Sequence, residues 1–224
     1  MSTRWSALLL AGLVTAGCAQ PDIVSRDAPF AEPGQPTMSA RAAAFEVAEI
    51  AVVVPEELSV SEANSFFPDA DIVWRGDPLG DRHEQVHNIL SDALMLAGEG
   101  LAGPERIRVE IKLERFHALT QKARYTTGGL HNIRFVLQFR DLATGGLIGE
   151  PTRVNASLIA YGGQRAIEAD ARGETQRVRI TRHVADVVRG HLGAPPLGLP
   201  LPEGHAIADA RPAPAPAADT GAPG

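Results

Sequence analysis

The chain has 224 residues, of which 44% are hydrophobic, and a formal net charge of −6 at pH 7. That length suits one domain of ordinary size with additional segments. The acidic balance and the lack of a basic block argue against a nucleic-acid-binding protein. Cys18 is the only cysteine, which excludes a disulfide within the chain and a cysteine metal site.

The first 17 residues are typical of a secretory signal peptide. Arg4 precedes a short apolar run that could not span a bilayer as a mature helix. Thr15-Ala16-Gly17 leads to Cys18 and resembles the lipobox of bacterial lipoproteins, although that motif usually has Leu where Thr15 stands. The resemblance implies that Cys18 becomes the first mature residue and carries acyl chains, which anchor the protein facing the periplasm. By the same resemblance, Ala19 favours the outer membrane.

Composition divides the remaining chain into three segments. Residues 18–42 contain several prolines and no sustained period, so we expect a flexible tether. Residues 43–193 have the alternating patterns of an ordered periplasmic domain. Residues 194–224 are rich in Pro and Ala and predict a disordered tail, because such a composition buries little apolar surface.

Hydrophobic periodicity gives the elements of the domain in chain order. The predicted elements are a strand at 45–55, a helix at 82–98, strands beginning at 107, 133 and 152, and a helix at 173–192. The connection 56–80 could hold a short strand at Ile72–Trp74. The order β-α-β-β-β-α predicts an α+β fold, with an antiparallel sheet of about four strands and two helices packed on one face.

The predicted first helix begins with His83-Glu84-Gln85-Val86-His87, which matches the zinc-hydrolase pattern H-E-x-x-H. Asp81 offers another explanation, because Asp81 and Glu84 have the spacing of a helix capping box. No third ligand follows at the spacing of the extended zinc motif. We therefore expect a helix start with no metal or other cofactor. A zinc-dependent hydrolase using His83, Glu84 and His87 is the alternative.

Two surfaces are candidates for binding a partner, and the sequence does not choose between them. One is the outer sheet face, predicted to be mildly basic. Its cations are Arg108, Lys112, Arg134, Arg140 and Arg153. The stronger candidate is the predicted loop 119–132 with Lys122, Arg124 and Tyr125, because loops on rigid sheets often carry function. Arg75-Gly76-Asp77 is interpreted as a packed turn beside Trp74.

Three stretches of the domain, together with the lipobox, resemble a group of uncharacterised alphaproteobacterial lipoproteins over most of residues 18–193. They are WRGDPLGDRHEQV, FVLQFRDLATGGLIGE and ETQRVRITRHVADVVRGHL. The element order also resembles small periplasmic lipoprotein domains that serve as accessory subunits of envelope machines. These resemblances imply a non-enzymatic, lipid-anchored protein that binds another envelope component. A direct lipid or glycan binder is a further alternative.

Overall fold

The computed structural model describes residues 42–198. The predicted signal peptide, Cys18, the tether up to residue 41 and the tail from residue 199 therefore lie outside the described residues. No helix within 42–198 is long and apolar enough to cross a membrane.

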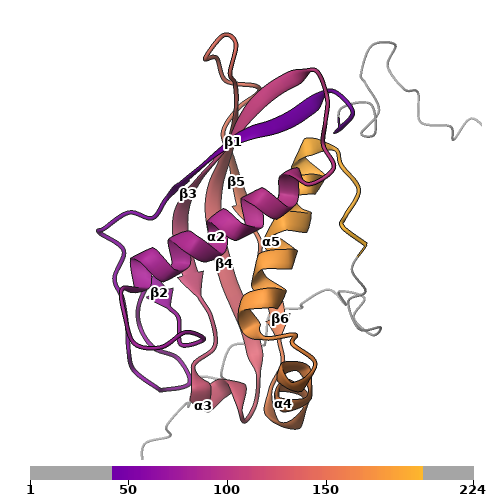
Figure 1. The fold of residues 1–224 in the computed structure, drawn as a ribbon. Helices are drawn as coiled ribbons and strands as arrows, with labels where there is room; N and C mark the ends of the chain where they lie inside the picture. Colours follow the sequence, from indigo (N-terminus) through magenta and orange to yellow (C-terminus); the bar gives the residue numbers. More distant parts are fainter. Residues whose placement is uncertain (1–41, 199–224) are drawn as a thin grey trace, which may run out of the picture. The chain divides into compact units, whose positions relative to one another are not determined.

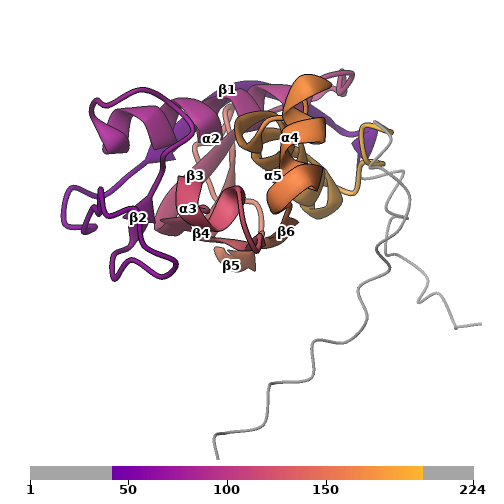
Figure 2. The same cartoon turned by 90° about the horizontal axis from the view of Figure 1, so that it is seen from below.

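A six-stranded sheet forms one layer, and helices α2 and α5 cover one of its faces (Figures 1 and 2). The strands are β1 Phe45–Val53, β2 Ile72–Val73, β3 Glu105–His117, β4 Gly129–Asp141, β5 Thr152–Asn155 and β6 Leu158–Ala160. The helices are α2 Arg82–Gly98, α3 Gln121–Arg124, α4 Gly163–Ala171 and α5 Gln176–Leu192. The predicted α+β class and the helix at 82–98 are confirmed.

The prediction of an antiparallel sheet is wrong for its first two strands. Both β1 and β2 run parallel to β3, whereas β4 is antiparallel to β3, β5 and β6. The reason is the connection through α2, which crosses from β1 to β3. A helix crossover of this kind returns the chain in its original direction, whereas a tight hairpin reverses it.

The segment predicted as one strand from 152 to 161 is two strands, β5 and β6. The chain turns between them, where the Asn155 side chain accepts hydrogen bonds from the Ser157 N–H at 3.1 Å and the Ser157 hydroxyl at 2.6 Å. As a result, β5 pairs with Arg134–Leu137 and β6 pairs with Gly129–His131.

Three further differences concern two short helices and the start of α5. The predicted loop 119–132 contains α3 and the first residues of β4, and α4 was not predicted. Helix α5 begins at Gln176, after Thr175 caps it by accepting a hydrogen bond from the Val178 N–H at 3.3 Å. The predicted start at 173 is therefore three residues early, because Gly173 adopts a left-handed φ of 79° that is not helical.

The core lies between the sheet and the two long helices. Alternate residues of β3 and β4 point into it, as the period-two pattern predicted, and each large apolar side chain buried there contributes about 1.5–3 kcal/mol. The strand residues are Ile107, Val109, Ile111, Leu113, Ile133, Phe135 and Leu137. The helix residues are Val86, Ile89, Leu90, Ala93, Leu94 and Ala97 of α2, and Ile180, Val184, Ala185, Val188 and Leu192 of α5.

Arg189 joins the ends of α2 and α5. Its buried guanidinium donates to the carbonyl oxygens of Ala97 at 2.9 Å and Glu99 at 2.8 Å, which satisfies groups that the end of α2 leaves unpaired. It also donates to Pro195 O at 2.7 Å, and Leu197 N donates to Asp186 at 2.8 Å. The first residues of the segment predicted as a tail, 194–197, are therefore packed on α5.

Candidate binding cleft

The Arg75-Gly76-Asp77 segment is a packed turn over Trp74, as predicted. Trp74 is fully buried, and its indole N–H donates to Asp77 Oδ2 at 2.8 Å. A Cβ atom on Gly76 would lie 2.3 Å from the indole ring, so only glycine allows the backbone to pass this close. The turn is thereby held in one place beside the start of α2.

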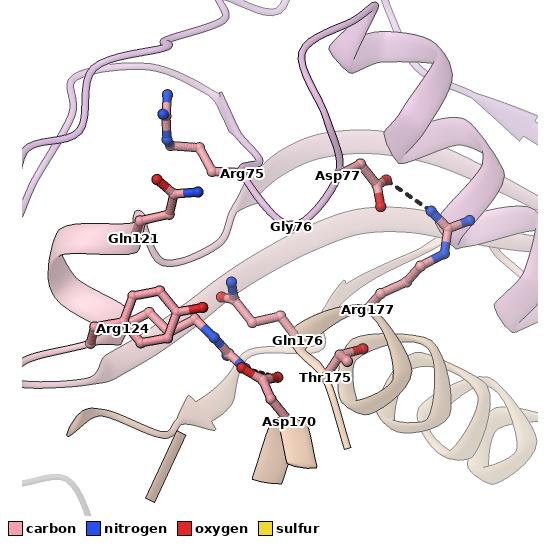
Figure 3. Close-up of a pocket in the computed structure, with 10 residues that line it drawn as sticks. Arg75, Gly76, Asp77, Gln121, Arg124, Asp170, Thr175, Gln176 and Arg177 are labelled. Atoms are coloured by element: carbon pink, nitrogen blue, oxygen red, sulfur yellow. Dashed lines mark hydrogen bonds and ion pairs between the residues drawn. The ribbon is translucent and has the colours of Figure 1, made fainter. Parts of the chain in front are cut away.

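A cleft of about 450 Å³ opens where this turn faces α3 and the first turn of α5. Helices α3 and α4, which both contribute lining residues, lie at the same end of the described domain (Figure 1). The lining residues come from three segments distant in sequence (Figure 3): Arg75, Gly76 and Asp77; Gln121, Arg124 and Tyr125; and Asp170, Thr175, Gln176 and Arg177. Its volume is within the range of about 300–1,000 Å³ typical of small-molecule sites.

Local packing fixes each of the three walls. The Thr120 hydroxyl accepts from the Ala123 N–H at 3.2 Å and donates to Ser65 O at 2.8 Å, so α3 is both capped and tied to the 56–71 loop. Helix α4 buries Ala166 and Ala169 beside Tyr161, which orients Asp170 towards α3. The cleft is therefore built from elements that hydrogen bonds and packing fix in position, which a precise binding site requires.

Every arginine of the cleft has a carboxylate partner. Arg177 lies 2.9 Å from Asp77 Oδ2 and 3.0 Å from Asp92 Oδ2. Arg124 donates to Asp170 Oδ1, and Arg75 lies 3.2 Å from Glu62 Oε2.

The Glu62 carboxylate beside Arg75 is also held by Arg82, at 2.5 Å. The hydrogen bond from Arg82 keeps the pKa of Glu62 below its ordinary value. The charges around the cleft are therefore neutralised before any ligand arrives.

Gln176 is the most deeply buried side chain of the cleft with an unsatisfied atom. It reaches from the first turn of α5 between Arg124 and the Gly76 turn (Figure 3), and the residue is only 4% exposed. Its buried Oε1 atom has no hydrogen-bond partner in the described part of the chain. Arg75 Nε also lacks a partner there, but the same guanidinium is already held by Glu62. Leaving a buried polar atom unpaired costs about 1–3 kcal/mol, so the Gln176 amide is the group of the cleft with the most to gain from a hydrogen-bonding partner.

The three residues predicted for partner binding have different environments. Tyr125 is 51% exposed and Lys122 is exposed, with its ammonium 4.7 Å from the centre of the Phe66 ring. Arg124 is only 4% exposed and is ion-paired with Asp170. The expectation that Arg124 is an exposed loop residue is wrong, because α3 turns its side chain inward to Asp170.

The start of α2 has the geometry of a helix cap. Asp81 Oδ1 accepts from the His83 N–H at 2.9 Å and the Glu84 N–H at 3.1 Å, so the predicted cap is confirmed. The reciprocal hydrogen bond from the Glu84 side chain is not formed within 42–198. His83 Nε2 lies 3.1 Å from Leu58 O, and His87 is exposed.

Within residues 42–198, no three His, Cys, Asp or Glu side chains are arranged to hold a metal ion.

The outer sheet face is solvated and ion-paired. Arg108 Nε lies 2.7 Å from Glu49, Arg140 lies 3.3 Å from Glu110, and Arg153 lies 2.9 Å from Glu114. Exposed pairs of this kind contribute about 0–1 kcal/mol each. The predicted basic character is thus largely cancelled by acids on other strands of the same sheet.

Behind the cleft, His131 of β4 is completely buried. Leu119 N donates to its Nδ1 atom at 3.3 Å, which places the proton of the neutral ring on Nε2. That Nε2 atom has no partner within the described residues. Burial first, and then the charges of Arg179, Arg124 and His183, lower the pKa of His131 to about 3.

A search of the curated proteins found no match. Solved structures that match this chain include two with low similarity to it. A candidate lipoprotein from Caulobacter crescentus CB15 has 14% identity and a TM-score of 0.29, over 70% of this chain and 92% of that one. A PelC dodecamer from Paraburkholderia phytofirmans has 15% identity and a TM-score of 0.31, over 67% of this chain and 91% of that one. At these TM-scores, neither likeness supports a conclusion.

The sequence also matches a family model over residues 45–200, which is more than half of the chain. The matched range begins with β1 and includes every later strand and helix of the described residues. The chain therefore belongs to DUF6778, a family of unknown function.

Proposed function

We propose that this protein is a lipid-anchored, non-enzymatic domain that faces the periplasm, at the outer membrane, and binds another component of the envelope through the cleft. The observation that carries the proposal is Gln176, a nearly buried amide whose Oε1 atom has no partner in the described residues. Tyr125, half exposed on the same cleft, supplies the kind of aromatic anchor that binding sites favour.

Binding is favoured over catalysis by the state of the cleft carboxylates. Asp77 accepts from both Trp74 and Arg177, and Asp170 is paired with Arg124. A general base must reach a substrate proton with a free lone pair at a suitable pKa. Carboxylates already occupied by guanidinium and indole donors are better suited to holding the walls of a binding site.

The anchor rests on the sequence around Cys18, and the length of the tether fits it. The tether from Cys18 to residue 41 has 24 residues, which span at most about 80 Å when extended. A domain on such a tether can reach a partner in the same membrane or in the space beside it.

The experiment places the photo-crosslinking amino acid p-benzoylphenylalanine at Tyr125 of the full chain in its native envelope. The matched control carries it at Leu147, which is 48% exposed in the turn after β4. Irradiation should yield an adduct at Tyr125 that Gln176→Leu abolishes, and no adduct at Leu147. The same membranes with Cys18→Ser should lose fatty-acid labelling and release the protein from the membrane fraction.

Two results would count against the proposal. Equal amounts of adduct at both positions, or no adduct at Tyr125, would show that the cleft is not the binding site. Unchanged fatty-acid labelling of Cys18→Ser would remove the lipid anchor.

A further inference from the structure

We propose that the cleft binds a neutral saccharide unit, an inference that rests on the proposed function and names the chemistry of its ligand. The proposal follows from which groups of the cleft are already satisfied and which are not. The charged groups have partners, and the clearest unmet capacity is that of a neutral amide.

The charge balance excludes an ionic ligand first. An acidic ligand would need a free cation, but Arg75, Arg124 and Arg177 are each held by a carboxylate. Arg124 is only 4% exposed, and a ligand that drew it away would leave the Asp170 carboxylate without its cation. Breaking such a partly buried ion pair is strongly unfavourable. A basic ligand would have to compete with Arg177 for Asp77, whose Oδ2 atom already accepts from that guanidinium.

The Gln176 amide then selects the ligand group. Its Oε1 atom needs a donor, and the same amide carries two N–H donors. A hydroxyl group is both donor and acceptor, and two adjacent hydroxyls can meet both ends of one planar amide. If the oxygen and nitrogen positions of Gln176 were exchanged, the buried atom would be a donor, and a hydroxyl could pair with it as an acceptor. Vicinal hydroxyls without charge are the characteristic groups of neutral sugars.

The rest of the cleft suits the same ligand. The exposed Tyr125 side chain offers a flat aromatic face for the C–H groups of a sugar ring and a hydroxyl at its tip. Gln121 of α3 adds a second amide to the cleft, and its side chain is exposed. The volume of about 450 Å³ is ample for a sugar unit but small for a folded partner. The cleft therefore receives a part of a glycan chain rather than a protein surface.

The test titrates the full chain in detergent with uncharged oligosaccharides, namely cellotetraose, maltotetraose and chitotetraose. Trigalacturonic acid and inorganic phosphate serve as anionic probes, and binding is followed by calorimetry and by saturation-transfer NMR. At least one neutral probe should bind with a Kd below about 1 mM. Gln176→Leu should weaken that binding at least about tenfold, since it leaves the sugar hydroxyls unpaired.

Two further variants keep the result interpretable. Gln164→Leu is the matched control, because Gln164 is exposed on α4 and does not line the cleft; it should leave the Kd unchanged. Tyr125→Ala changes an exposed side chain and should weaken binding without unfolding, so it tests the same site should Gln176→Leu fail to fold.

Three outcomes would overturn the inference. In the first, only the anionic probes bind. In the second, no neutral probe binds detectably at concentrations up to about 10 mM. In the third, a neutral probe binds equally well to the wild type, Gln176→Leu and Tyr125→Ala. The Tyr125 crosslink separates this inference from the proposed function. An adduct destroyed by periodate supports a saccharide, whereas a periodate-resistant polypeptide adduct leaves the cleft as a binding site and rejects the sugar.

Discussion

The outer sheet face and the cleft both contain arginines paired with acids, yet they differ in burial and in what they leave unsatisfied. On the outer face, Arg153 is 84% exposed in its side chain and pairs with Glu114 in water. In the cleft, the Arg124 side chain is 5% exposed and pairs with Asp170. The ion pairs of the outer face lie at or near solvent, whereas the cleft keeps a buried amide oxygen without a partner among the described residues.

This difference shows that charge density alone is a poor guide to a binding surface. From the sequence, Lys112 and Arg134 suggest that the outer face is a binding surface. Water already supplies the hydrogen bonds of an exposed side chain, however, so a hydrogen bond from a ligand adds little free energy there. A buried group without a partner gains the full hydrogen bond when a ligand arrives. The unsatisfied group therefore locates the site better than the sum of the charges does.

The largest effect should come from breaking the buried pair. Arg124→Ala leaves Asp170 without its cation, and we expect a loss of about 3 kcal/mol in the free energy of unfolding. Arg153→Ala is the matched change on the outer face and should cost less than about 0.5 kcal/mol. Urea denaturation of both variants measures the two values. Equal losses would show that burial does not separate the two regions as argued.

Most of the fold could be predicted from local patterns. The strand at β1, the helix at α2 and the inward residues of β3 and β4 follow from hydrophobic periods that local sequence sets. The direction of β1 in the sheet could not be read from local periods, because it depends on the strand with which β1 pairs after the α2 crossover. The β-α-β order contained that information, since such a connection joins parallel strands. Helix α4 was missed because its N-cap is Gly162 with no side-chain hydrogen bond to mark the start.

The cleft could not be predicted from the sequence, because its walls come from residues near 75, 123 and 175. No short motif joins them, and Gln176 is an ordinary residue in a helix start until the fold buries it. The predicted loop contributes Tyr125 and Arg124 to the lining of the cleft. Their roles could not be separated, because the same four-residue helix turns one side chain out and the other inward to Asp170.

His131 extends the comparison to pH, since it is a second buried group with an unpaired atom on the covered side of the sheet. Its pKa is about 3 in the folded protein and about 6.5 in the unfolded chain. Between pH 3 and pH 6.5, His131 binds a proton in the unfolded chain but not in the folded protein. The contribution of His131 to the free energy of unfolding is therefore complete above pH 6.5 and is lost as the pH falls towards 3. At pH 5 the loss from His131 should be about 2 kcal/mol.

The measurement compares wild type with His131→Gln, which does not titrate. Urea denaturation at pH 7 and pH 5 should show a smaller drop for the variant, although His183, whose pKa burial also lowers, still contributes in both proteins. Parallel losses in the two proteins would mean that water or a change of conformation compensates the buried ring.

The smallest effects belong to the exposed start of α2, and they also decide the zinc alternative. Asp81 accepts from two backbone N–H groups, so Asp81→Ala should cost about 1 kcal/mol, the usual value of an N-cap. His87→Ala should cost less than about 0.5 kcal/mol, because His87 is exposed. His83→Ala loses only its contact with Leu58 O and should lie between the two. A zinc site would reverse this order, since removing either histidine ligand would then destabilise the protein more than removing the cap. One equivalent of zinc in untagged protein, lost in both His83→Ala and His87→Ala, would displace the cap as the role of this motif and make the zinc hydrolase the leading hypothesis.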